Sequence, residues 1–384
     1  MRNGSVFETV SFSNAGKFDI LGMFCATNFG QVSFMKPITV YDIAKEANVS
    51  VATVSRVLNN TAPVKKETRE RINELISKYQ FQPNALARSL SKKETGMIGI
   101  ILPDITNPFF PEVLSGFDLE ARKRGYTYFL CDTVSASVDS TEQYIRESQY
   151  LNALAEKQVD GIVMMGGRVD LAKPDQQLIE EVAEIGKRLP VLLVNGRLPK
   201  SGLNRVAVDE RHGAELAAQH LIELGHRDIA IVGGFRHMSN TVERTSSFMK
   251  RIGRFGLEVR KEWVLHGGFS VASGTAFMNQ LLELPKRPTA VFCLNDLVAI
   301  GVLKAAVKAG LRVPEDLSII GYDDIPFASN SIPELTTVSL RTHELGRTAG
   351  EVLHQMITKT KVNKTTLLKP ELVVRESTAA LNRG

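Results

Sequence analysis

Residues 41–59 read YDIAKEANVSVATVSRVLN and predict two short helices joined by a tight turn. Thr39 and Asp42 stand three residues apart, which matches a capping box at the start of the first helix. Asn48 tolerates the left-handed conformation that ends a helix, and Ser50 is placed to cap the second helix. The turn between the two helices is therefore only about three residues long.

A third helix is predicted over residues 67–79, because apolar side chains recur there at helical spacing. Two helices joined by a tight turn and followed by a third are typical of a helix-turn-helix, whose second helix enters the major groove of DNA. A plain helical hairpin, with its charged side chains in solvent, is the alternative.

The first turn of such a second helix reaches the base edges, and nearby hydroxyl and amide groups bind phosphates. Arg56 could donate two hydrogen bonds to guanine, and Ala52 could touch a thymine methyl group. The candidates for base contact are Val51, Ala52, Ser55 and Arg56. The other DNA-binding candidates in this region are Ser50, Thr53 and Asn59 for phosphates, and Thr39 at the start of the first helix.

The positive charge of the chain is concentrated around these helices. The net charge is +5, and residues 35–95 hold 11 Lys and Arg against 6 Asp and Glu, whereas residues 1–34 and 96–384 are each balanced. A basic segment on a neutral body suggests a polyanionic partner, and a solvated basic surface is the alternative. Residues 1–35 lack clear periodicity and predict a disordered extension, or an apparent start upstream of the natural one.

The rest of the chain predicts an α/β body. Its 384 residues, 43% hydrophobic and 23% charged, suit two or three folded domains. From residue 97, short apolar strands alternate with helical segments, which indicates parallel sheets with right-handed crossovers. The expected strands form a first series at 97–102, 126–131, 161–166 and 191–195, and a second series at 205–209, 228–234, 289–295 and 317–324. The expected helices lie at 109–124, 139–156, 175–188, 211–224, 240–255, 296–309 and 343–358.

Two such series indicate two doubly wound parallel-sheet subdomains, with a ligand cleft between them at the carboxyl ends of the strands. The predicted domains are an all-α head over 36–82, a hinge helix and linker over 83–95, and the α/β body over 96–384. Within the body, the N-terminal subdomain is expected at about 96–196 and 326–358, and the C-terminal subdomain at about 197–325 and 359–380.

Enzyme and membrane signatures are absent from the sequence. Cys25, Cys131 and Cys293 lie more than 100 residues apart, so neither a disulfide framework nor a cysteine-based zinc site is expected, and a reducing cytosol fits. None of the motifs GxSxG, HExxH, GxxxxGK and GxGxxG occurs, so we expect no catalytic residues, no metal site and no cofactor. Asp209 and His226 are expected in structural roles. We also expect no membrane span and no export signal, which predicts a cytoplasmic protein.

The sequence resembles the lactose/galactose-repressor family of bacterial transcription regulators over essentially residues 36–380. The segments that carry the resemblance are TVYDIAKEANVSVATVSRVLN from Thr39, PNALARSL from Pro83, IILPDITNPFF from Ile100, and CLNDLVAIGVLKAAVKAGLRVPEDLSIIGYDD from Cys293. The resemblance implies a DNA-reading helix-turn-helix head and an effector domain similar to periplasmic binding proteins.

The resemblance also implies a second DNA-binding element, a hinge helix. In the family, a leucine of each protomer's hinge helix wedges into the minor groove at the operator centre, and Leu90 stands at that position. Asn84 and Ala87 are the accompanying candidates. The alternative is that Leu86 and Leu90 simply pack on the body.

Seven residues are candidates for effector binding: Phe109, Phe110, Asn195, Arg244, Phe269, Asn295 and Asp323. Five of them follow or end predicted strands, and the resemblance adds Arg244 and Phe269. Carboxylate, amide and guanidinium groups bind hydroxyls, and aromatic faces cover a sugar ring or a nucleobase, so the set suits a sugar-like or nucleoside-like effector. The alternatives are a core role for the Phe109-Phe110 pair, a helix cap for Asn295 and a turn cap for Asp323. Asn195 departs from the acidic residue that some members carry there.

The function implied is that of a ligand-controlled transcription regulator, most often a repressor in this family. It would act as a dimer or tetramer on a pseudo-palindromic DNA operator, with an effector changing the angle between the subdomains. Some members respond instead to a phosphorylated carrier protein. A solute-binding protein of a transporter and a sugar-modifying enzyme are the alternatives from other classes.

Overall fold

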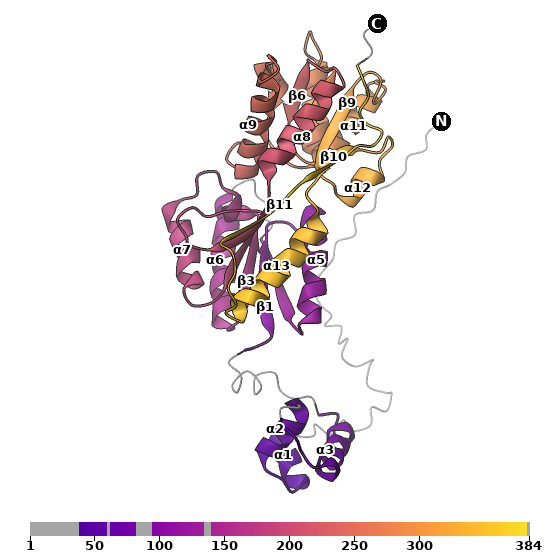
Figure 1. The fold of residues 1–384 in the computed structure, drawn as a ribbon. Coiled ribbons are helices and arrows are strands. Elements are labelled where there is room, and N and C mark those ends of the chain that lie inside the picture. The colour runs from indigo at the N-terminus through magenta and orange to yellow at the C-terminus, as the bar shows by residue number, and fades with distance from the viewer. Residues whose placement is uncertain (1–37, 60–61, 82–93, 134–139, 382–384) are drawn as a thin grey trace, which may run out of the picture. The chain divides into compact units, whose positions relative to one another are not determined.

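The computed structural model describes residues 38–59, 62–81, 94–133 and 140–381. The chain divides into two compact units, residues 1–84 and 85–384 (Figure 1). The expected extension over residues 1–35 lies outside the described residues. So do the hinge candidates Asn84, Ala87 and Leu90, whose roles remain predictions.

The first unit contains the three predicted helices, α1 (Val40–Glu46), α2 (Val51–Asn59) and α3 (Lys66–Lys78). The capping box is confirmed, because the Asp42 amide donates to the Thr39 hydroxyl and the Asp42 carboxylate accepts from the Thr39 amide. Asn48 has the predicted left-handed conformation, with φ of 51°. The hydroxyl of Ser50 accepts from the Thr53 amide at 3.2 Å, which caps α2.

The three helices enclose a small apolar core that fixes how α2 is presented. The buried residues of this core are Ile43, Ala44, Ala47, Val54, Val57 and Ile72. Lys78 and Tyr79, at the end of α3, both donate to the Glu46 carboxylate at the end of α1, at 2.9 and 2.7 Å. The inner face of α2 is therefore held by packing, and its opposite face is left to solvent.

Within the described residues, the second unit contains two six-stranded sheets. The first sheet has the order β11-β5-β4-β3-β1-β2, and its strands are all parallel. Its strands are β1 (Met97–Leu102), β2 (Thr127–Asp132), β3 (Gly161–Met165), β4 (Val191–Val194), β5 (Asn204–Val208) and β11 (Thr365–Leu368). One face is covered by α5 (Phe109–Lys123) and α13 (Thr342–Ile357), the other by α6 (Ser140–Glu156) and α7 (Gln176–Gly186).

The second sheet has the order β12-β10-β9-β8-β6-β7 and is parallel except for its β10–β12 pair. Its strands are β6 (Ile229–Val232), β7 (Val264–Leu265), β8 (Ala290–Cys293), β9 (Ser318–Asp323), β10 (Thr336–Ser339) and β12 (Glu371–Val373). One face carries α8 (Glu210–Glu223) and α9 (Ser239–Gly253), and the other α10 (Val271–Leu282) and α11 (Asp296–Lys308). The short helices are η2 (Gly167–Asp170), η3 (Lys261–Trp263) and α12 (Pro326–Ser329).

Three strands lie in a different sheet from the one predicted. β5, expected to open the second series, pairs with β4 and β11 in the first sheet. The prediction was wrong because residues 195–203 connect β4 and β5 without a helix, which interrupts the alternation on which it rested. β10 belongs to the second sheet although residues 326–340 were expected in the N-terminal subdomain, and β11 belongs to the first although residues 359–368 were expected in the C-terminal one. The chain therefore crosses between the sheets after β5, after β10 and after β11.

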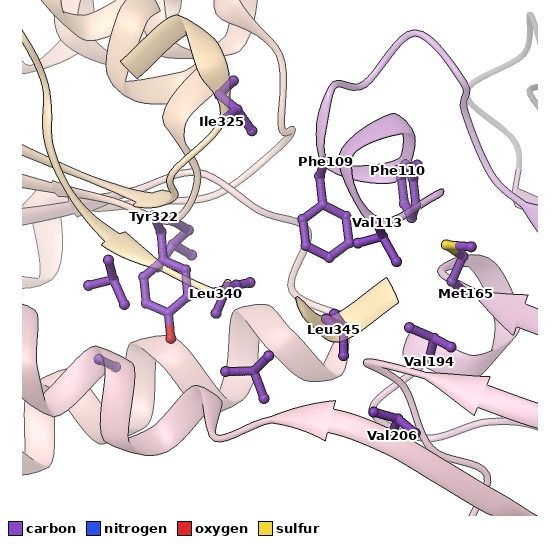
Figure 2. Packing of buried hydrophobic residues seen from close by; sticks show 14 of the residues in the cluster. Phe109, Phe110, Val113, Met165, Val194, Val206, Tyr322, Ile325, Leu340 and Leu345 are labelled. Carbon is purple, nitrogen blue, oxygen red and sulfur yellow. The ribbon is translucent and has the colours of Figure 1, made fainter. Parts of the chain in front are cut away.

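A buried cluster continues from the first sheet into the second (Figure 2). It includes Met165, Val194 and Val206 from the first sheet and Tyr322 from the second, with Leu340 on the connection between β10 and α13. This shared core lies beside the carboxyl ends of the parallel strands, where a cleft is expected. In the described part of the chain, no helix is both long and apolar enough to cross a membrane.

Candidate functional site

The exposed face of α2 is the candidate DNA-reading surface. Val54 and Val57 point into the core, whereas Ala52 and Arg56 are exposed one helical turn apart. Val51 and Ser55 are half-buried beside them. The four predicted base-contact residues therefore all keep some exposure, as a helix that enters a groove requires.

Three of the other DNA-binding candidates, Thr39, Ser50 and Thr53, take part in helix capping. The Thr39 hydroxyl donates to the Asp42 carboxylate at 2.6 Å, and the hydroxyls of Ser50 and Thr53 lie 2.9 Å apart. The side chain of Asn59 lies outside the described residues. These capping hydrogen bonds do not prevent the same side chains from contacting DNA phosphates. The phosphate contacts therefore stay predictions.

A cavity of about 690 Å³ lies between the two subdomains of the second unit. All seven candidate effector residues line it: Phe109, Phe110, Asn195, Arg244, Phe269, Asn295 and Asp323. The strand-end positions thus meet at one site although they come from two sheets, as the cleft prediction requires.

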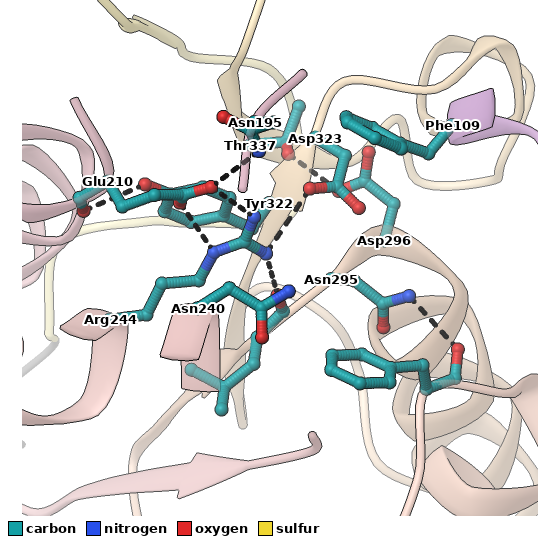
Figure 3. A network of polar contacts seen from close by, with 12 residues as sticks. Phe109, Asn195, Glu210, Asn240, Arg244, Asn295, Asp296, Tyr322, Asp323 and Thr337 are labelled. Carbon is teal, nitrogen blue, oxygen red and sulfur yellow. Dashed lines mark hydrogen bonds and ion pairs between the residues drawn. The ribbon is translucent and has the colours of Figure 1, made fainter. Parts of the chain in front are cut away.

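Arg244, in α9, is the centre of a buried polar network (Figure 3). Its side chain is bonded to both carboxylate oxygens of Glu210, at 2.7 and 3.0 Å, and donates to the carbonyl of Leu294. It also forms an ion pair with Asp323 at 3.2 Å, and the guanidinium carbon lies 3.9 Å from the centre of the Tyr322 ring. The Arg244 guanidinium, which was predicted to bind the ligand, is therefore already bonded to protein groups.

Glu210 was not predicted as a site residue, yet it organises this network. It stands in the first turn of α8, after Asp209, whose side chain caps that helix as expected. Asn195 donates to the Glu210 carboxylate at 2.9 Å and accepts from the Val208 amide at 3.0 Å. The signal in the sequence was an acidic residue directly after a helix cap, which is common at helix starts and does not by itself indicate a site.

Asp323 ends β9 in a strained conformation, with φ of 106°. It is 6% exposed, and burial raises its pKa to about 7 in spite of the opposing effect of the Arg244 charge. Its Oδ1 atom is the one paired with Arg244 at 3.2 Å, and no other described residue is bonded to that atom. Asp323 thus faces the cavity as a carboxyl with unused hydrogen-bonding capacity, rather than as a turn cap.

Asn295, Phe109 and Phe110 were predicted to bind the effector, with a helix cap or a core role as the alternative, and the structure gives them both positions. Asn295 caps α11 by accepting from the Val298 amide at 3.1 Å, and it donates to the Phe269 carbonyl at 3.0 Å. Phe109 and Phe110 pack edge to face, 5.2 Å apart, inside the main core cluster. All three residues line the cavity, so a structural role and a place at the site coexist.

Two further expectations concern structural residues and metals. His226 is 2% exposed and bonded to Thr289, Ser318 and the Ala379 carbonyl, which confirms its structural role. Among the described residues, no group of three or more His, Cys, Asp and Glu side chains is placed to hold a metal ion.

A helix-turn-helix head followed by a two-lobed body with a polar cavity defines a ligand-responsive DNA-binding regulator. Comparison with known families agrees. Residues 39–84 match the family described as "Bacterial regulatory proteins, lacI family", and residues 218–378 match a periplasmic binding protein-like domain.

Similar proteins of known name extend the match to nearly the whole chain. The HTH-type transcriptional repressor PurR of Photobacterium profundum is 34% identical over 90% of this chain and 99% of its own length. The HTH-type transcriptional regulator DegA of Bacillus subtilis is 34% identical, with the same coverage. Among solved structures, the Lac repressor dimer bound to operator and the anti-inducer ONPF matches with a TM-score of 0.80 at 27% identity, over 90% of this chain and all of that one. The CelR–cellobiose complex matches with a TM-score of 0.64 at 29% identity, over 88% of this chain and 99% of that one.

The chain belongs to the LacI family of bacterial regulatory proteins. It is accordingly a DNA-binding transcriptional repressor regulated by a small molecule. The transporter alternative is not supported, because the similarity includes the DNA-reading head.

Proposed function

We propose that the chain represses transcription as a homodimer in the bacterial cytoplasm. Each protomer places α2 in the major groove of one half-site of a pseudo-palindromic operator, with Arg56 and Ala52 on base edges. Thr39, Ser50, Thr53 and Asn59 hold the backbone, and the residues of the hinge, Asn84, Ala87 and Leu90, bind the minor groove between the half-sites.

The effector is a sugar-like or nucleoside-like molecule that binds in the cavity between the subdomains. Its binding changes the angle between the two lobes, and this alters the spacing of the two hinge helices in the dimer. The observation that carries this proposal is the cavity itself, because side chains from both sheets line it. A phosphorylated carrier protein is a further partner that the family allows.

A Leu90→Gly substitution separates the two halves of the proposal. The operator affinity of the variant should fall and the bend of its operator should decrease, because the wedge at the centre is lost. Effector affinity, measured by calorimetry, should stay close to that of the wild type, because the described residues that line the cavity all follow the hinge in sequence, from Pro103 onward. An undiminished DNA bend would contradict the role of Leu90.

A further inference from the structure

Asp170 lines the cavity but takes no part in the Arg244 network. It ends η2, directly after β3, and therefore belongs to the first sheet's subdomain, whereas Arg244 and Asp323 belong to the other. Its Oδ1 atom is buried without a hydrogen-bond partner among the described residues. Buried polar atoms are nearly always satisfied in folded proteins, so this orphan atom requires an explanation.

This oxygen packs closely against the backbone of Gly196. A Cβ atom at position 196 would lie 2.8 Å from Asp170 Oδ1 and 2.5 Å from a methyl group of Val169. Only glycine fits there, and no side chain reaches across to satisfy the carboxyl group. Asp170 Oδ1 thus lacks a partner because of how the residues of the cavity wall pack around it.

The neighbouring Arg168 fixes the position of Asp170. Arg168 is fully buried and binds Glu147 at 2.7 Å, and it also donates to Glu181 and to the Tyr144 carbonyl. These contacts hold η2 against α6 and α7. Displacing the backbone of η2, and Asp170 with it, would therefore break a buried ion-pair network.

The charges that line the cavity restrict what can bind beside Asp170. Asp104, Asp170 and Asp323 line it, and Arg244 is the one Lys or Arg among the lining residues that the structure describes. Arg244 is already bound by Glu210 and Asp323. An anionic ligand would thus meet carboxyl groups with no uncommitted arginine or lysine to neutralise it.

We propose that Asp170 binds the effector directly, through a hydroxyl or amino group of a molecule that carries no phosphate or carboxylate. This inference rests on the proposed control by a small molecule. Burial and the nearby Glu210 charge raise the pKa of Asp170 to about 8, because both disfavour the charged form of its carboxyl group.

Asp170 is also placed to transmit binding to the other subdomain. The next residue, Leu171, forms a backbone bridge with Met238, and the Ala172 amide donates to the His237 carbonyl at 2.9 Å. His237 and Met238 precede α9, which carries Arg244. A ligand held by Asp170 and Asp323 together would therefore span both walls beside an existing contact between them.

The first test uses the protein without effector. Asp170→Asn should raise the melting temperature at pH 8 by about 2–4 °C, because it replaces a carboxyl group that is partly charged at this pH by a neutral amide of the same shape. Asp175→Asn is the matched control on the same segment, because Asp175 caps α7 through the Gln177 amide at 2.8 Å and should not gain stability. A fall in the melting temperature of Asp170→Asn would assign Asp170 a structural role and overturn the proposal.

The second test uses a bacterial metabolite extract divided on a strong anion exchanger. The unretained fraction, which contains neutral and cationic molecules, should raise the melting temperature of the wild type, and Asp170→Asn should need about ten-fold more of it for the same shift. A shift caused by the retained, anionic fraction, or an equal response of the variant, would overturn the inference and leave small-molecule control intact. No shift with either fraction would contradict the control by a small molecule itself.

Discussion

At the scale of single residues, the head and the body use arginine in opposite ways. Arg56 is an exposed cation on α2, whereas Arg244 is 3% exposed and its charge is used within the protein. A buried arginine held by Glu210 and Asp323 shapes the cavity wall and orients two carboxyl groups. An exposed arginine on a recognition helix keeps its donors for a base.

Arg56→Ala should lower operator affinity by about 1–3 kcal/mol and relax the base preference at one position of each half-site. The measurement is a binding-site selection with the wild type and the variant. Arg71→Ala is the control, because Arg71 is an exposed arginine of α3, away from the recognition helix. The control should change affinity, if at all, evenly for all sequences. An unchanged sequence logo for Arg56→Ala would exclude a base contact.

The buried carboxyl groups predict a pH dependence of stability. The folded-state pKa of Asp170 is raised to about 8, above its ordinary value, so the folded chain keeps a proton that the unfolded chain releases near pH 4. Stability from this group is therefore complete at low pH and is lost as the pH rises to about 8. The charged groups that act on it are Glu210 of α8, Arg244 of α9 and Glu147 of α6.

Melting temperatures measured between pH 5 and 8 should thus fall less steeply for Asp170→Asn than for the wild type. Part of the slope should persist in the variant, because the pKa of Asp323 is also raised, to about 7. Identical slopes for the two proteins would show that Asp170 does not titrate in this range.

At the scale of elements, much of the architecture is predictable from local patterns. The capping box of α1, the cap at Ser50 and the apolar strands all depend on residues close in sequence, and the structure has them where they were predicted. Their existence was predictable because hydrogen bonds at helix starts and runs of apolar side chains are short-range features.

The placement of strands and of several site residues depends on contacts that are distant in sequence. β5 follows β4 without a helix and pairs with β4 on one side and, on the other, with β11, which begins more than 150 residues later. The helix α10 was also missed. Glu210 and Asp170 were overlooked for the same reason, because only the tertiary fold brings Glu210 to Arg244 and Asp170 to the cavity.

The close packing of α5 against α13 at two glycines could not be predicted from the local sequence either. A Cβ atom at Gly116 of α5 would lie 1.9 Å from the His343 carbonyl oxygen, and one at Gly346 of α13 would lie 1.8 Å from that of Val113. The two helices therefore approach so closely that only glycine fits on either side. Nothing in the local sequence distinguishes these glycines from others within helices.

Substitutions at Asn295 test how an element and the site share one residue. Asn295→Ala should lower the free energy of unfolding by about 0.5–2 kcal/mol, because α11 loses its cap. Asn295→Asp keeps the acceptor for the Val298 amide and should retain most of that stability, although it cannot donate to Phe269. Urea denaturation of the two variants is the measurement. Equal stability of Asn295→Ala and the wild type would contradict the capping role.

At the scale of the whole molecule, the chain joins two kinds of surface on separate fold units. The head presents a recognition helix on a small apolar core, and the body encloses a cavity between two lobes that the chain crosses repeatedly. Because the chain crosses between the lobes three times, a change in the angle between the lobes involves all three connections. This arrangement suits a regulator, because the free energy of ligand binding in the body can change the affinity of the chain for DNA.

The most direct test of the central claim is a selection of genomic DNA fragments by the purified full-length chain, with Arg56→Ala as control. We predict enrichment of fragments that share one pseudo-palindromic motif, and a weaker, less selective enrichment by the control. Recovery of fragments with no shared motif, at the level of random competitor DNA and with or without metabolite extract, would contradict the account.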